Sequence, residues 1–138
     1  MARILALDYG IRRTGVAVTD PFQLIASGLT TVPTEDLWTF LDTYLKEEDV
    51  ERIVVGEPKQ MDNTPSEVEG AIGKFLLEFS KRYPKMPVSR EDERFTSKMA
   101  LRAMIDGGMK KKKRRQKGAL DEISATLILQ SFLSRKTL

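Results

Sequence analysis

The beginning of the chain constrains its fold more than any other stretch. Residues 3–20 read RILALDYGIRRTGVAVTD, an apolar run that ends on a carboxylate, turns at a glycine and returns as a second apolar run. Because side chains alternate along a strand, Ile4, Ala6 and Asp8 share one face of the first predicted strand. A charge there must be solvated, paired or bound to metal. We expect Asp8 at the edge of a buried sheet, although Asp is also a common turn former beside glycine.

The absence of two residue types limits the chemistry. The chain contains no histidine and no cysteine. This excludes imidazole bases, zinc sites built on His or Cys, Ser-His-Asp triads and thiolate nucleophiles. If the protein is an enzyme, carboxylates, hydroxyls and Lys or Arg side chains must do its chemistry.

Length and hydropathy predict one compact domain spanning residues 1–138. The hydrophobic content of 41% in 138 residues is enough for a full core. No apolar run approaches the length that crosses a bilayer, and residues 1–3 lead into a strand rather than a signal peptide. We therefore expect a soluble, cytoplasmic protein with no membrane partner. The lack of cysteine agrees with a reducing compartment.

Hydrophobic periodicity predicts a mixed α/β order. In chain order we expect a strand–turn–strand unit, a third strand at 24–32, a helix capped by Thr34 and a strand at 52–56. A helix should then run from a capping box at 64–67 to about Lys81, followed by a strand at 88–95. The chain should end with a helix from Thr96 or Ser97 to about Gly107 and a last helix from about Ala119 to Arg135. This is the order of the ribonuclease H-like fold. It implies a mixed five-stranded sheet, with an antiparallel three-stranded meander and two parallel strands, flanked by helices.

Two further carboxylate positions join Asp8 as candidates. Five of the six residues 90–95 are charged, which is unusual for a strand. A functional site at Asp92 or Glu93 would explain these charges, and so would an edge strand whose charges prevent pairing with another chain. Asp121 lies in the first turn of the last helix, where the helix dipole alone would favour it. Its face of that helix continues with the small residues Ser124 and Ala125, so this turn can pack closely on a sheet with Asp121 inward.

A cluster of these carboxylates would require cations. Two carboxylates about 4 Å apart repel by roughly 4 kcal/mol at an effective dielectric constant of about 20. Three of them persist together only when cations or protons neutralise their charge. Oxygen ligands without imidazole or thiolate select Mg²⁺ or Mn²⁺, and such ions activate water for attack on a phosphodiester.

Basic charge is concentrated in one segment. The net charge is only +3, yet residues 110–117 (KKKKRRQK) carry seven basic side chains. Such a run is often simply a solvated loop. It is equally a phosphate-contacting arm, because clustered Lys and Arg release counterions from a nucleic acid.

Four sequence blocks resemble the YqgF/RuvX family of pre-16S ribosomal RNA nucleases, whose members were also proposed as Holliday junction resolvases. The blocks are LALDYGIRRTGVAVTD at 5–20, IVVGEPKQMDNT at 53–64, DERFTS at 92–97 and KGALDEISATLILQSFL at 117–133. The chain departs from the family pattern at Arg12-Arg13-Thr14 and at Glu57. These departures keep positive charge beside Asp8 and add a carboxylate in the second block, near its loop.

The resemblance implies a ribonuclease H-like nuclease whose metal ligands are Asp8, Glu93 and Asp121, with Asp92 as an alternative to Glu93. The expected substrate is structured RNA, an rRNA precursor, and the alternative is branched DNA. We expect a monomer or weak homodimer that uses Mg²⁺ or Mn²⁺. The side chains expected to bind phosphates are Arg12, Arg13, Lys59, Arg94, Lys110, Lys111, Lys112, Lys113, Arg114, Arg115 and Lys117.

Two other classes of function remain open from the residues alone. A nucleic-acid-binding module without catalysis needs only the basic run. An ATPase related to actin would use the strand–turn–strand unit, but such proteins close two similar lobes around a nucleotide, and 138 residues provide one.

Overall fold

The computed structural model describes residues 2–58, 68–92 and 117–137, with the backbone alone for 117–120, 136 and 137. Within these ranges five strands form one mixed sheet in the order β3-β2-β1-β4-β5. The strands are β1 (Arg3–Tyr9), β2 (Arg13–Thr19), β3 (Ala26–Pro33), β4 (Val50–Glu57) and β5 (Val88–Asp92). The β1–β2 and β2–β3 pairs are antiparallel, and the β1–β4 and β4–β5 pairs are parallel. The predicted meander with two parallel strands is confirmed.

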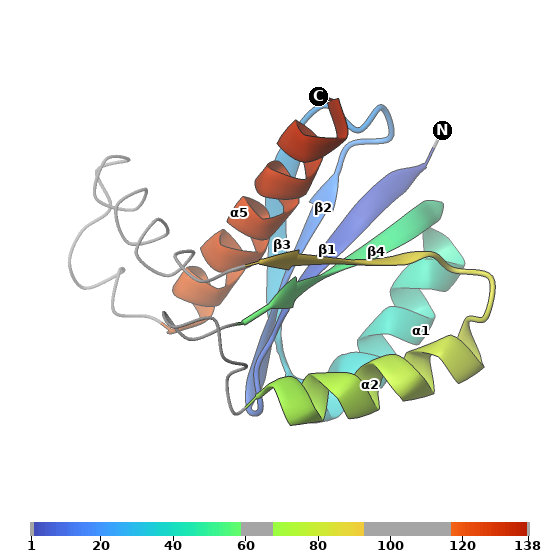
Figure 1. The fold of residues 1–138 in the computed structure, drawn as a ribbon, viewed down its shortest axis with the longest axis vertical. Coiled ribbons are helices and arrows are strands. Elements are labelled where there is room, and N and C mark those ends of the chain that lie inside the picture. Colours follow the sequence, from blue (N-terminus) through green and yellow to red (C-terminus); the bar gives the residue numbers. More distant parts are fainter. Residues whose placement is uncertain (1, 59–67, 93–116, 138) are drawn as a thin grey trace.

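Helices cover both faces of this sheet. A 3₁₀ turn, η1 (Thr34–Asp36), leads into α1 (Leu37–Glu47), and α2 is Glu69–Arg82. These two helices lie on one face, and α5 (Lys117–Thr137) lies across the other (Figure 1). No helix in the described ranges is long and apolar enough to span a bilayer.

The core beneath α1 and α2 is large and aromatic. Alternate residues of β1, β2 and β4, such as Leu7, Val16 and Val55, are fully buried against these helices. Phe75 and Phe79 of α2 stack with Trp38 of α1 at ring-centroid distances of 4.9 and 6.4 Å. Burying each such side chain contributes about 1.5–3 kcal/mol, so this face supplies most of the apolar stabilisation.

The core beneath α5 is built from smaller side chains. Ala6 and Ala17 of the sheet meet Ala125, Ile128 and Leu129 of α5, all of them buried. The register explains this set, because Ala6 pairs with Ala17 across the β1–β2 ladder and both point to the α5 face. Small residues on both sides allow the helix to approach the strands closely.

Several predicted boundaries differ from the observed ones. The third strand begins at Ala26 rather than at residue 24, and the last helix begins at Lys117 rather than at Ala119. The helix thus includes Gly118, which its first turn tolerates because the backbone N–H groups there have no partner within the helix. The predicted capping box at 64–67, helix at 96–107 and basic run at 110–116 lie outside the described residues, as does the end of the strand predicted at 88–95.

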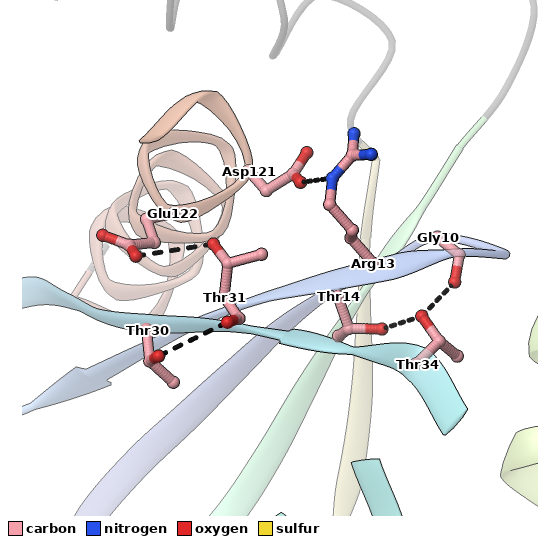
Figure 2. A network of polar contacts seen from close by, with 8 residues as sticks. All are labelled: Gly10, Arg13, Thr14, Thr30, Thr31, Thr34, Asp121 and Glu122. Carbon is pink, nitrogen blue, oxygen red and sulfur yellow. Dashed lines mark hydrogen bonds and ion pairs between the residues drawn. The ribbon is translucent and has the colours of Figure 1, made fainter. Parts of the chain in front are cut away.

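Thr34 does not cap α1 as predicted. The helix follows Asp36, which makes no side-chain capping bond. The Thr34 hydroxyl instead donates to the carbonyl oxygen of Gly10 at 2.6 Å, so the Thr14 hydroxyl, 2.9 Å away, donates to Thr34 (Figure 2). Thr34 therefore fastens the turn between β1 and β2, next to Asp8.

Candidate active site

Asp8 lies at the end of β1 on the α5 face of the sheet. It has the same strand parity as Ile4 and Ala6, which pack under α5, and its side chain is half-buried. Its direct cross-strand partner in β2 is Gly15. The next residue, Tyr9, has the opposite parity and packs on Phe75, where burial raises the pKa of its phenol.

Gly15 allows the first turns of α5 to touch the sheet beside Asp8. A Cβ atom on Gly15 would lie 2.1 Å from the carbonyl oxygen of Asp121 and 3.1 Å from its Cβ. Only a glycine fits here, because real Cβ atoms never come so close to a backbone oxygen. The contact fixes Asp121 directly over the strand position that pairs with Asp8. Two of the predicted carboxylate positions therefore meet at one end of the sheet and on one face.

Arg13 orients the carboxylate of Asp121. The two residues are 108 positions apart in sequence, and the Arg13 Nε donates to Asp121 Oδ2 at 2.8 Å (Figure 2). Both side chains are partly buried, with exposed fractions of 39% and 21%. Within the described part of the chain, the two terminal nitrogens of Arg13 make no further hydrogen bond. They remain available to an anionic ligand.

A neighbouring contact holds the same turn of α5. The hydroxyl of Thr31 on β3 donates to Glu122 Oε1 at 3.4 Å (Figure 2). Since Thr31 pairs with Gly15, both anchoring contacts of α5 lie on the same row across the sheet. The position of Asp121 is thus fixed from β2 and β3 together.

The charged strand β5 is explained largely by internal ion pairs. Arg90 makes two hydrogen bonds to Glu69 of α2, at 2.9 and 3.1 Å, and also binds the carbonyls of Val55 and Gly56. Glu91 points to the α5 face, is 8% exposed, and pairs with Arg135 at 2.6 Å. These partners lie far away in sequence, so their roles could not be predicted from residues 90–95 alone.

Asp92 points to the face of the sheet opposite to the one that carries Asp8. Glu91 faces α5, so Asp92, the next residue of the strand, points to the opposite face, where it is exposed. Of the other predicted site residues, Arg12 is exposed in the β1–β2 turn and Lys117 begins α5. Those outside the described residues are Glu93, Lys59, Arg94, Lys110, Lys111, Lys112, Lys113, Arg114 and Arg115.

The described residues contain no group of three carboxylates close enough to hold a metal ion. They bring together Asp8 and Asp121, with Arg13 beside them. Sequence reasoning missed two residues that build this arrangement, Gly15 and Thr34. The first had a signal, because small residues on one face of α5 call for a small partner on the sheet; the second had none.

Comparison with known proteins agrees with this fold. A family described as RuvX, Holliday junction resolvase, matches residues 2–135. A protein of Christiangramia forsetii named "Putative pre-16S rRNA nuclease" is 66% identical over 133 residues, covering 96% of this chain and 98% of its own. A protein of the same name from Flavobacterium johnsoniae is 56% identical over 136 residues, covering 99% of each chain.

Two solved structures that share this fold are resolvases. Thermus thermophilus RuvC in complex with a Holliday junction substrate superposes with a TM-score of 0.55 at 20% identity, covering 99% of this chain and 96% of that one. The fowlpox virus Holliday junction resolvase gives a TM-score of 0.54 at 15% identity, covering 96% and 99%. These likenesses establish the ribonuclease H-like sheet and helix arrangement. With the match along residues 2–135 and relatives more than half identical over nearly their full length, they show that this chain belongs to the RuvX family of nucleases.

Proposed function

We propose that this protein is a metal-dependent nuclease that processes the precursor of 16S ribosomal RNA. One observation carries the proposal: the Gly15–Asp121 contact brings Asp121 over the strand position paired with Asp8, on one face and at one end of the sheet. Relatives at 66% and 56% identity are named for this substrate. Such a function belongs in the bacterial cytoplasm, where rRNA is transcribed.

The donor chemistry of this end of the sheet fits a hard divalent cation. Asp8 and Asp121 offer carboxylate oxygens, and oxygen ligands favour Mg²⁺ or Mn²⁺. When bound, such an ion supplies Lewis-acid activation of water and of a phosphoryl oxygen. Because side chains alternate along β5, Asp92 points to the face of the sheet opposite to α5. We therefore assign the third carboxylate to Glu93, which lies outside the described residues.

The other residues of the site would bind the phosphates of the substrate and orient the carboxylates. Arg13 holds Asp121 with Nε, and its terminal nitrogens face the substrate side, where they would contact phosphate oxygens. Thr34 keeps the β1–β2 turn, and with it Arg12, in one conformation. We keep Lys59, Arg94 and the basic side chains of 110–117 as predicted phosphate contacts, since clustered cations strengthen binding to nucleic acids.

The test is cleavage of a precursor 16S rRNA fragment and of a four-way DNA junction, each with Mg²⁺, Mn²⁺ or chelator. We expect metal-dependent cleavage of the RNA, lost in the Asp8→Asn, Asp121→Asn and Glu93→Gln variants. The matched control is Asp49→Asn, because Asp49 is an exposed carboxylate just before β4, at the end of the sheet opposite to Asp8. That variant should cleave like the wild type.

Three outcomes would change the assignment. Near wild-type cleavage by Asp8→Asn would overturn the nuclease site. Cleavage of the junction without cleavage of the RNA would make the protein a resolvase. Normal cleavage by Glu93→Gln, with loss in Asp92→Asn, would transfer the third ligand to Asp92.

A further inference from the structure

A basic groove lies on the α5 face, away from Asp8. It has a volume of about 400 Å³ and is lined by Arg52 of β4, Ser89 of β5, and Phe132 and Arg135 of α5. We call it the arginine groove. Its strand residues share the parity of Val54, which packs under α5, so the groove and the candidate active site open on the same face of the sheet.

Arg52 enters the groove with its charge uncompensated. Its Nη1 donates to the hydroxyl oxygen of Ser89 at 2.7 Å. Within the residues that the structure describes, it forms no ion pair with a carboxylate. The Ser89 contact fixes one nitrogen and leaves the other donors of the guanidinium for a ligand.

Arg135 is held over the groove by a buried carboxylate. Its Nη2 lies 2.6 Å from Oε2 of Glu91, and the Ser131 hydroxyl donates to Oε1 of the same carboxylate at 3.1 Å. Its guanidinium carbon also lies 5.8 Å from the ring centre of Phe132. With its side chain 60% exposed, Arg135 is positioned on one side and open to solvent on the other.

The charge of the groove matches one phosphodiester. Two guanidinium groups and the single carboxylate of Glu91 leave one net positive charge, and a phosphodiester carries one negative charge. Guanidinium groups bind phosphate oxygens through paired N–H donors. We propose that the arginine groove binds one phosphodiester of a nucleic acid strand whose scissile bond lies at the Asp8 end of the sheet. This identification of the strand rests on the proposed function.

The position of the groove favours a strand over a free phosphate compound. Arg52 and Gly56 lie four residues apart on β4, which spans about 13 Å at about 3.3 Å per residue. Gly56 is next to the strand end that carries Asp8. Val54, which lies between them, is fully buried under α5, so a strand that joins the two places must run beside this helix. Stacked nucleotides rise about 3.4 Å each, so such a strand needs at least roughly four nucleotides.

The experiment measures binding of a single-stranded octauridylate in chelator, where no cleavage occurs, over a range of salt concentrations. We compare wild type with Arg52→Gln, Arg52→Lys and the control Arg82→Gln, which removes the same charge from α2 on the opposite face. We expect Arg52→Gln to weaken binding about five- to tenfold and to flatten the slope of log affinity against log salt by roughly 0.7. Arg52→Lys should restore part of the affinity, and Arg82→Gln should match the wild type.

Competition with inorganic phosphate and uridine monophosphate distinguishes the two sources of phosphate. A strand site predicts that neither competes at concentrations near that of the octauridylate; equal affinity for the mononucleotide would overturn it. An unchanged salt slope in Arg52→Gln would also overturn it. Cleavage of precursor rRNA is scored separately. Loss of binding in Arg52→Gln without any wild-type cleavage would refute the proposed function alone, and cleavage with unchanged binding would refute the groove alone.

Discussion

The face of the sheet under α1 and α2 and the face under α5 are built from different residues. The first packs Leu, Val and Phe side chains with stacked rings, and its two helices are joined by the contact of Tyr83, just after α2, with Asp42 in the middle of α1. The second packs alanines and a glycine against α5, and it carries Asp8 and the ion pairs Arg13–Asp121 and Arg135–Glu91. Small residues on this face leave room for charges that a tightly filled aromatic core would exclude.

The residues that contribute most to stability therefore lie on one face of the sheet, and the candidate site residues lie on the other. Apolar burial stabilises the fold through the first face, while the carboxylates of the second are costly to hold near one another without a cation. Variants on the α1–α2 face should therefore change mainly the free energy of unfolding, and variants at the carboxylates of the α5 face should change mainly the rate of cleavage.

The largest effect is expected at the Asp8 end of the α5 face. Asp8→Asn and Asp121→Asn should each lower cleavage by at least about 1,000-fold, and the double variant should lose little more, because ligands of one site fail together. The melting temperature of Asp8→Asn should equal or exceed that of the wild type, since a repulsive charge is removed, whereas Asp121→Asn also loses its ion pair with Arg13. Cleavage rates and thermal melts measured on the same samples check this. Additive losses would mean that the two carboxylates act separately.

On the other face, Phe79→Ala should reverse this pattern. Phe79 is 1% exposed, stacks with Trp38 and packs against the tilted ring of Phe75, so truncation should cost about 3–5 kcal/mol of unfolding free energy. Cleavage at a temperature where the variant stays folded should be unchanged. Urea titration gives the free energy of unfolding. A folded but inactive Phe79→Ala protein would contradict the separation of the two faces.

Gly15→Ala should change both quantities. Its new Cβ would meet the Asp121 carbonyl at 2.1 Å, so α5 must shift, at a cost of about 1–3 kcal/mol, and Asp121 moves with it. The control is Gly73→Ala in α2, where nothing lies within 4 Å of the added Cβ. That change should stabilise the protein by up to about 1 kcal/mol and leave cleavage intact. A fully active Gly15→Ala would show that the contact does not place Asp121.

The smallest effect concerns Tyr83, which follows α2 and donates to Asp42 of α1. Burial and this carboxylate raise the pKa of Tyr83 to about 12. The unfolded chain loses the same proton near pH 10, so stability from this residue is complete below about pH 10 and declines as the pH rises toward 12. Tyr83→Phe should show a shallower decline of melting temperature between pH 9 and 11. Identical curves for both proteins would remove Tyr83 as the cause.

The sequence predicted what depends on local patterns. The period-two alternation of apolar residues placed Asp8 at a strand end. The small residues Ser124 and Ala125 correctly indicated that α5 packs closely on the sheet, and the point of closest approach is at Gly15. Contacts between distant residues were beyond such reasoning. Arg90 and Glu69 are 21 residues apart, and Glu91 and Arg135 are 44 apart, so the charges of β5 could not be divided into structural and functional ones without the fold.

The Arg13–Asp121 pair also has a consequence for when the protein becomes active. Its 108-residue separation means that the sheet and the α1–α2 core can assemble before the site exists. During synthesis, the five strands emerge ahead of α5, so the proposed carboxylate site stays incomplete until the helix docks. Reversible detachment of α5 would likewise switch off cleavage while the rest of the domain stays folded, and hydrogen exchange would then report lower protection in α5 than in β1.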